Sequence, residues 1–212
     1  MSKNSPRSWY DNAPTTWIDT TREVDVSSHY QRFVPLLRPN AHVLEIGCGA
    51  GRDAKHFNDL FLRITAIDAS PTMCDETRAH AGPEVKVECV PLLEFNSDGQ
   101  RYDGVWALAA LVHATDDELA RSFPKIASLL QPGAPFYTTF KFAENSWTDA
   151  NGRFYNWMTP SRLTSLLSDA GFERIEITQE NDTMGRPESW LSCVCIAKHP
   201  VLSPSTDVAT MR

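Results

Sequence analysis

The stretch that decides the fold is Val43-Leu-Glu-Ile-Gly-Cys-Gly-Ala-Gly-Arg-Asp53, in which an apolar strand runs into three alternating glycines. Glycine tolerates positive φ and lets a ligand approach the main chain, so this turn suits a nucleoside-bearing molecule. The alternative is a tight turn that only packs a helix on a strand. The next strand ends in Asp68, 68 − 47 = 21 positions after Gly47. At this spacing an acid meets ribose hydroxyls in dinucleotide folds.

Outward from this turn, short apolar runs alternate with amphipathic segments, which is typical of strands alternating with helices. The sequence therefore predicts an α/β fold with a doubly wound, mostly parallel, Rossmann-like sheet of seven strands. The last two strands have no helix between them, so they are expected to pair antiparallel at the C-terminal edge. Pro124 predicts a kink or a later start in the helix over 116–130. The later strands are predicted at 102–108, 136–142, 172–178 and 190–197, and the later helices at 116–130 and 159–171.

The N-terminal part is expected to cover the site. Residues 27–37 read as a leading helix, and residues 9–30 carry Trp9, Tyr10, Trp17 and Tyr30. This is more aromatic surface than a free tail leaves in water, so we expect a helical lid. The domain is predicted over 9–198, with mobile ends at 1–8 and 199–212 because these are rich in Pro, Ser and Thr.

Composition excludes several classes of protein. The 20 basic and 27 acidic residues give a net charge of −7, so nucleic acid is not an expected partner. No segment approaches the roughly 20 apolar residues of a membrane span, and the polar start lacks a secretion signal, so we expect a cytoplasmic monomer or homodimer without membrane association. The five cysteines form no C-x-x-C motif, which argues against a metal site and a disulfide framework.

The type of cofactor depends on what faces the glycine turn. A nicotinamide fingerprint needs Gly or Ala at the sixth position of the motif, which here is Arg52. Glu45 would repel a pyrophosphate, whereas it suits a ligand with an ammonium group. An amino-acid-bearing nucleoside is therefore favoured over NAD.

Glu-Ile-Gly-Cys-Gly-Ala-Gly at 45–51, with Ala-Ile-Asp at 66–68, resembles the class I S-adenosylmethionine-dependent methyltransferases over about residues 30–198. Within that superfamily, Gly-Arg-Asp-Ala at 51–54, Phe-Lys-Phe-Ala-Glu at 140–144 and Gly-Arg-Phe-Tyr at 152–155 are similar to small bacterial methyltransferases related to the tellurite-resistance type. The resemblance implies S-adenosylmethionine as cofactor.

The resemblance also implies the residues that hold this cofactor. The glycines lie beside the methionine part, Asp68 binds the ribose, and Ala69 and Met73 lie near the adenine. Where the family usually offers an acid to the adenine, this sequence has Leu92, so we expect the main-chain amides of Leu92 and Leu93 to take that place. Tyr10 is our candidate for a cation–π contact with the sulfonium. The expected cofactor-binding residues are Tyr10, Glu45, Gly47, Gly49, Gly51, Asp68, Ala69, Met73, Leu92, Leu93 and Ala107.

His113 follows the fourth strand, where a base can deprotonate a nucleophile. The alternative is a histidine that only bonds the backbone. If they converge, Lys141, Arg153 and Arg186 favour an acceptor with a carboxylate or phosphate, and Tyr155 offers an aromatic wall. The expected function is methyl transfer to an N, O or S nucleophile of a small molecule in secondary metabolism or detoxification. A macromolecular acceptor, a nucleotide-dependent oxidoreductase and a non-catalytic binding module are the alternatives.

Overall fold

The computed structural model describes residues 6–199. Residues 1–5 and 200–212 lie outside the described residues, and with them most of the two expected mobile ends. Residues 6–8 belong to the first helix. Among residues 6–199, no helix has both the length and the apolar character that crossing a bilayer requires.

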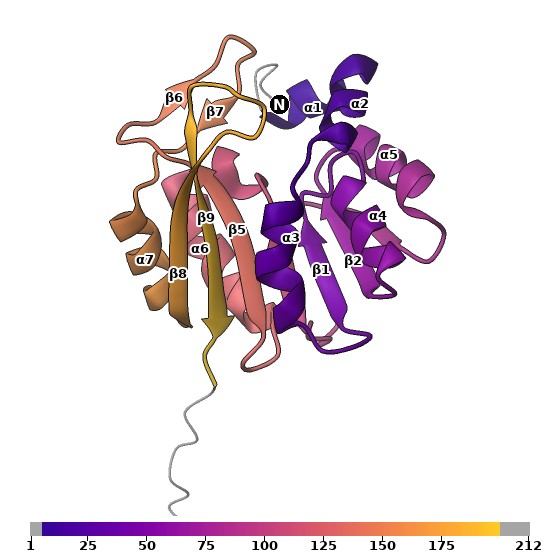
Figure 1. Ribbon diagram of the computed structural model, residues 1–212, viewed down its shortest axis with the longest axis vertical. Helices are drawn as coiled ribbons and strands as arrows, with labels where there is room; N and C mark the ends of the chain where they lie inside the picture. Colours follow the sequence, from indigo (N-terminus) through magenta and orange to yellow (C-terminus); the bar gives the residue numbers. More distant parts are fainter. Residues whose placement is uncertain (1–5, 200–212) are drawn as a thin grey trace, which may run out of the picture.

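One sheet of seven strands organises the molecule, in the order β3-β2-β1-β4-β5-β9-β8 (Figure 1). The first five strands in this order are parallel, and β9 and β8 pair antiparallel at the C-terminal edge. The predicted doubly wound sheet is thus confirmed. The strands are β1 (His42–Ile46), β2 (Arg63–Asp68), β3 (Lys86–Cys89), β4 (Gly104–Ala107), β5 (Pro135–Lys141), β8 (Phe172–Asn181) and β9 (Ser189–Ala197).

Helices cover both faces of the sheet (Figure 1). On one face, Phe33 and Phe57 pack with Trp106 and Tyr137 in one apolar cluster. On the other face, the helices after β4 and β5 bury Phe123 and a leucine-rich stripe in a larger cluster. The first face carries α3 (Ser27–Phe33), η1 (Val34–Leu36), α4 (Arg52–Asp59) and α5 (Pro71–Ala81), and the second α6 (Asp116–Leu129) and α7 (Pro160–Asp169).

Local signals explain where the helices begin. The side chain of Thr159 caps α7 by accepting from the amide of Arg162, and Pro160 occupies its first turn, as predicted. Thr115 and Glu118 form a capping box that starts α6. This helix continues through Pro124, so the expected later start is wrong. The leading helix ends at Phe33 and continues as a 3-10 turn that contains Pro35.

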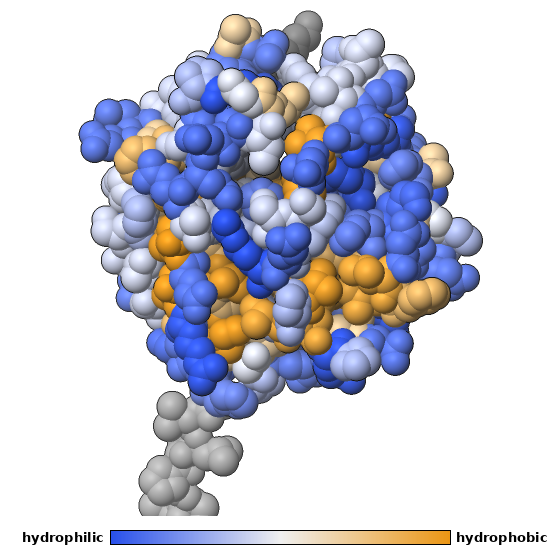
Figure 2. Space-filling model, in the orientation of Figure 1, coloured by the Kyte–Doolittle hydropathy of each residue, from blue (hydrophilic) through white to orange (hydrophobic). Residues whose placement is uncertain are grey.

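Two small units flank the carboxyl ends of the parallel strands (Figure 1). The N-terminal unit consists of α1 (Pro6–Asp11) and α2 (Thr15–Glu23). The other is a hairpin of β6 (Trp147–Thr148) and β7 (Phe154–Tyr155), which the sequence analysis did not predict. Figure 2 shows a band of hydrophobic side chains across the lower half of this face, away from the two units.

Candidate active site

The glycine turn after β1 has two packed glycines and one open glycine. A Cβ on Gly47 would lie 2.6 Å from the Cβ of Ala110, and one on Gly51 would lie 2.9 Å from the Cα of Thr77. A Cβ on Gly49 would meet no atom closer than 4.0 Å. All three have positive φ, so backbone geometry favours glycine at each position, and lack of space adds to this at Gly47 and Gly51. The main chain at Gly49 is therefore open to a ligand.

Asp68, at the end of β2, holds this turn in place. One carboxylate oxygen accepts the amide of Gly49 at 3.1 Å, and the other accepts that of Ser70 at 2.8 Å. Burial raises the pKa of Asp68 above its ordinary value, against the lowering effect of these backbone bonds. The acid that ends the second strand thus lies against the glycine turn, a contact that the sequence analysis did not predict.

A cavity of about 450 Å³ opens at the carboxyl ends of β1, β2, β4 and β5. It extends from the glycine turn to the first residues of β9, under α1 and α2. Its size falls in the range of about 300–1,000 Å³ typical of small-molecule sites. Most of the predicted site residues are on its wall, namely Tyr10, Gly47, Gly49, Asp68, Ala69, Leu92, His113, Lys141, Arg153, Tyr155 and Arg186.

The other predicted residues lie off this wall. Met73 is fully buried and packs in a cluster with Ile18 and Ala50, and Ala107 is fully buried in the core. The carbonyl of Leu93 accepts the ammonium of Lys125 at 3.0 Å. Apolar packing explains the positions of Met73 and Ala107, and the bond to Lys125 that of Leu93. The predicted residues off this wall are Glu45, Gly51, Met73, Leu93 and Ala107.

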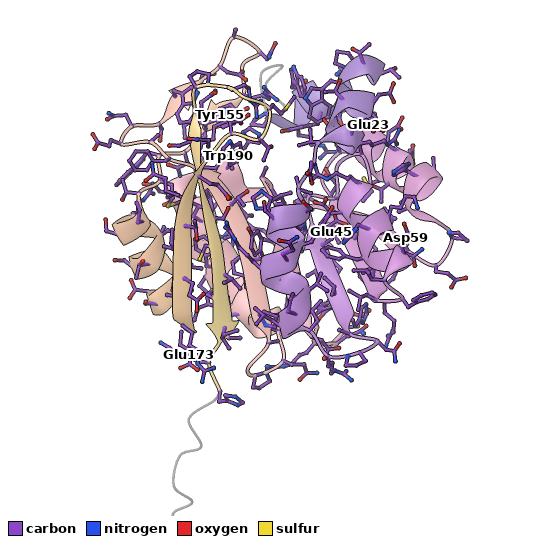
Figure 3. The ribbon with its side chains drawn as sticks, viewed as in Figure 1. Glu23, Glu45, Asp59, Tyr155, Glu173 and Trp190 are labelled. Atoms are coloured by element: carbon purple, nitrogen blue, oxygen red, sulfur yellow. The ribbon has the colours of Figure 1, made fainter. Side chains whose placement is uncertain are left out.

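Glu45 is a buried carboxyl beneath the glycine turn (Figure 3). Its Oε2 has no hydrogen-bond partner among residues 6–199. Burial, reinforced by the nearby charge of Asp53, raises the pKa of Glu45 well above its ordinary value. The environment of Glu45 therefore favours its neutral form, and Glu45 is not among the residues that line the cavity.

Asp53 joins α3, α4 and β4 from the start of α4. It accepts the hydroxyl of Tyr30 at 2.6 Å and the indole N–H of Trp106 at 2.9 Å. The guanidinium of Arg52 donates to both its oxygens, at 2.6 and 3.0 Å. Burial raises the pKa of Asp53, but Arg52 and these hydrogen bonds lower it overall. Asp53 and Arg52 also line the cavity, and the sequence analysis assigned a role to neither.

His113 lies between the N-terminal unit and the hairpin. Its Nδ1 is 2.6 Å from the carbonyl of Phe154 and therefore carries the proton and donates it. Its Nε2, 3.0 Å from the hydroxyl of Tyr10, therefore accepts. Burial lowers the pKa of His113 to about 4. The imidazole is neutral with its free lone pair already engaged, which favours the alternative of a histidine that bonds the backbone over a free general base.

Lys141, Arg153 and Arg186 all lie on the cavity wall, which meets the condition set in the sequence analysis, but each has an acidic partner. Glu188 lies 3.1 Å from the ammonium of Lys141. Asp149 lies 2.7 Å from the guanidinium of Arg153, and Asp182 lies 2.6 Å from that of Arg186. The expected attraction of Arg153 and Arg186 for a phosphate or a carboxylate is therefore largely cancelled within the protein, whereas the partner of Lys141 is more exposed.

The sequence analysis missed several wall residues near the end of β5. Trp190 opens β9, and its indole N–H donates to Asp182 at 2.7 Å. Thr139 lies on β5, and its hydroxyl accepts the amide of Ala109. An available signal was the position of Trp190 at the start of a predicted strand, but its pairing with the strand that ends in Lys141 was not predicted. Lys141 on β5 and Trp190 on β9 are paired in register.

The comparisons with known proteins agree with this geometry. Residues 43–133, which hold the glycine turn and Asp68, match the family model of a methyltransferase domain. The ubiquinone biosynthesis O-methyltransferase of Coxiella burnetii is 23% identical over 155 residues, which are 65% of this chain and 65% of that protein. The alpha N-terminal protein methyltransferase 1 of Arabidopsis thaliana is 28% identical over 127 residues, 55% of this chain and 46% of that protein. The chain thus spans at most about two thirds of these relatives.

Among solved structures, the 1,6-didemethyltoxoflavin-N1-methyltransferase of Burkholderia thailandensis, with bound 1,6-didemethyltoxoflavin and S-adenosylhomocysteine, superposes with a TM-score of 0.73. It is 23% identical, and the match covers 91% of this chain and 85% of that one. This likeness confirms the Rossmann-like fold. The named relatives include methyltransferases of small molecules and of proteins, so they support the predicted reaction type and leave the class of acceptor open.

Proposed function

We propose that the protein transfers the methyl group of S-adenosylmethionine to an N, O or S nucleophile of a small molecule. The observation that carries this proposal is one continuous cavity. Its first part is built from the open glycine turn and Asp68, and its second part from Lys141, Tyr155 and Trp190. Such a cavity holds a donor and an acceptor side by side, which supplies the proximity that a two-substrate reaction needs.

The first part of the cavity fits an amino-acid-bearing nucleoside. The main chain at Gly49 is open, and each oxygen of Asp68 accepts one backbone N–H, which leaves lone pairs for ribose hydroxyls. Gly47 and Gly49 would lie beside the methionine part, and Ala69 and Leu92 beside the adenine. When bound, the cofactor supplies a sulfonium methyl group for in-line transfer.

The chain's own residues orient the reactants and exclude water. In our proposal α1 and α2 act as the predicted lid. The hydroxyl of Tyr10 donates to His113, and Arg22 donates to the carbonyl of Ala50 in the glycine turn at 3.0 Å. Tyr10 is on the cavity wall, where its ring can face a cationic sulfur. We assign His113 the task of positioning Tyr10.

A small acceptor is favoured over a macromolecular one because two units cover the cavity. The guanidinium of Arg153, in the hairpin, lies 4.2 Å from the ring centre of Trp9 in α1, so this contact bridges the units. A protein segment would have to separate them. The narrower relation to the tellurite-resistance type, the role in secondary metabolism or detoxification, and the cytoplasmic location stay predictions.

Calorimetry with S-adenosylhomocysteine and with NAD tests the proposal. We expect binding of S-adenosylhomocysteine and no comparable binding of NAD. The reverse preference would overturn the proposal in favour of the oxidoreductase. A screen of small acceptors for release of S-adenosylhomocysteine then separates an enzyme from a non-catalytic binding module, which would bind the cofactor without turnover.

A further inference from the structure

The second part of the cavity surrounds one ammonium group. Lys141 ends β5, and only 9% of its side chain is exposed. Its Nζ lies 4.5 Å from the ring centre of Tyr155, 5.6 Å from that of Trp147 and 5.8 Å from that of Trp190. Figure 3 shows Tyr155 and Trp190 close to each other at the upper end of β9. Three aromatic rings thus surround the charge, and two of them, Tyr155 and Trp190, line the cavity.

This ammonium is short of hydrogen-bond acceptors. An ammonium has three N–H donors. Within residues 6–199, Lys141 has a single hydrogen-bond acceptor, Oε1 of Glu188, at 3.1 Å. Glu188 lies in the loop between β8 and β9 with 37% of its side chain exposed, so water weakens this pair. The remaining N–H donors are available to a ligand.

The other cations in the second part of the cavity are already paired, so a ligand bound here can be matched by one positive charge only. The guanidinium of Arg153 is held by Asp149 and that of Arg186 by Asp182, through hydrogen bonds of 2.8 and 2.6 Å. His113, whose ring centre lies 4.6 Å from that of Tyr155, is neutral because burial lowers its pKa to about 4. A dianionic phosphate would find one incompletely partnered cation here, whereas a monoanion matches it.

Resting on the proposed function, we infer that Lys141 determines specificity for a flat aromatic acceptor whose weakly acidic O–H or N–H group binds as a monoanion. Trp190 and the rim of the stacked Tyr155 line the cavity beside the ammonium, which suits the flat part of an aromatic acceptor. The ammonium holds the ionised group, and the aromatic enclosure strengthens this attraction relative to water. The acceptor then arrives as a nucleophile that has already lost its proton to solvent. The site therefore needs no free histidine as a base, and the Nε2 of His113 accepts the hydroxyl of Tyr10 instead.

The test uses 4-nitrophenol as the probe, because its ionisation is read directly from its absorbance. The probe is titrated with pH in the presence of the protein saturated with S-adenosylhomocysteine. We expect the pKa of the bound probe to lie about one unit below that of the free probe, a tenfold preference for the anion. Lys141→Met should abolish this shift, and Lys141→Arg should retain it. Glu188→Gln should enlarge the shift, because the competing carboxylate is gone.

Lys198→Met is the matched control. Lys198 follows β9 at the opposite end of the sheet, and its ammonium donates to the carbonyl of Ser168 at 3.4 Å. The shift should persist in this variant. A bound probe whose pKa equals or exceeds the free value, or no binding of the probe at all, would overturn the inference. Calorimetry with S-adenosylhomocysteine on the same samples separates the two claims, since failure of that binding in the wild type contradicts the proposed function instead.

Discussion

Asp68 is the residue whose loss should separate cofactor binding from folding. It lies at the end of β2 on the cavity wall, and its partners are two backbone amides of adjacent turns. We predict that Asp68→Ala weakens binding of S-adenosylhomocysteine by about 1–3 kcal/mol, the scale of lost hydrogen bonds to a charged group. Calorimetry measures the affinity, and far-UV circular dichroism should show an intact fold. Unchanged affinity would mean that the ribose lies elsewhere.

Asp53 should contribute to folding instead. Without its carboxylate, the charge of Arg52 and the polar groups of Tyr30 and Trp106 lose a shared partner. Because breaking a buried ion pair leaves an uncompensated charge, we predict that Asp53→Ala lowers the free energy of unfolding by about 3–5 kcal/mol. Urea denaturation measures the loss.

The control for Asp53 is on the same helix. Asp59 pairs with Lys55 at 2.7 Å, but 59% of its side chain is exposed, and Figure 3 shows it on the outer side of α4. Asp59→Ala should cost less than about 1 kcal/mol, as is usual for surface pairs. If Asp53→Ala and Asp59→Ala lower the free energy of unfolding equally, the buried network around Asp53 contributes no more to stability than a surface ion pair.

The contrast between Asp68 and Asp53 shows what the sequence reveals about single residues. Asp68 was predicted because its spacing from the glycines is a repeated feature of one fold. Asp53 was missed because an acid in the first turn of a helix is ordinary on electrostatic grounds alone. Its partners Tyr30 and Trp106 lie 23 and 53 positions away, and only the folded chain brings them together.

The N-terminal unit is the element whose behaviour we expect to depend on the cofactor. In Tyr10→Phe, the Nε2 of His113 loses its donor, so α1 is held less firmly. We predict faster hydrogen exchange over residues 6–23 in this variant. In the wild type, S-adenosylhomocysteine should slow exchange over residues 9–30, while α7 serves as an unaffected internal reference. If residues 9–30 exchange at the same rate with and without S-adenosylhomocysteine, the lid hypothesis is wrong.

Elements with local signals were predicted well, and elements held by distant contacts were not. The helix over 160–169 is specified by Thr159 and Pro160, which are adjacent in sequence. The strands β6 and β7 have two residues each, too few for any periodicity. Trp147 stacks on Tyr155 across this hairpin with ring centres 5.0 Å apart, a contact that no local pattern indicates.

At the scale of the whole molecule, the antiparallel edge was predicted without the order of its two strands. The structure inserts β9 between β5 and β8, so β8 is the edge strand. The amino-acid composition of the two strands explains this order. The last strand, Trp190–Ala197, is an apolar run that suits pairing on both sides, whereas Phe172–Asn181 alternates with charged residues that protect an open edge.

Acid stability is a property of the whole molecule that follows from three of its histidines. Burial lowers the pKa of His29 and takes those of His42 and His113 to about 4. The unfolded chain binds protons at these sites near pH 6.5, so between about pH 6.5 and 4 it holds more protons than the native state. The free energy of unfolding should therefore fall as the pH drops through this window, and the histidine contribution should level off below about pH 4.

Urea denaturation at about pH 7.5, 5.5 and 4.5 measures this dependence. The net charge of −7 shrinks as the pH approaches the isoelectric point near 5.3, which relieves self-repulsion and acts in the opposite direction. Salt at about 0.15 M screens that long-range effect, whereas the burial of the imidazoles is screened much less. The buried carboxyls of Glu45 and Asp68, whose pKa values are raised, bind protons in the native state and also act in the opposite direction. The comparison of the wild type with His113→Gln isolates the histidine contribution, because both carry these carboxyls. We expect a weaker loss of stability towards acid in His113→Gln, and an identical pH dependence of the two proteins would contradict the lowered pKa of His113.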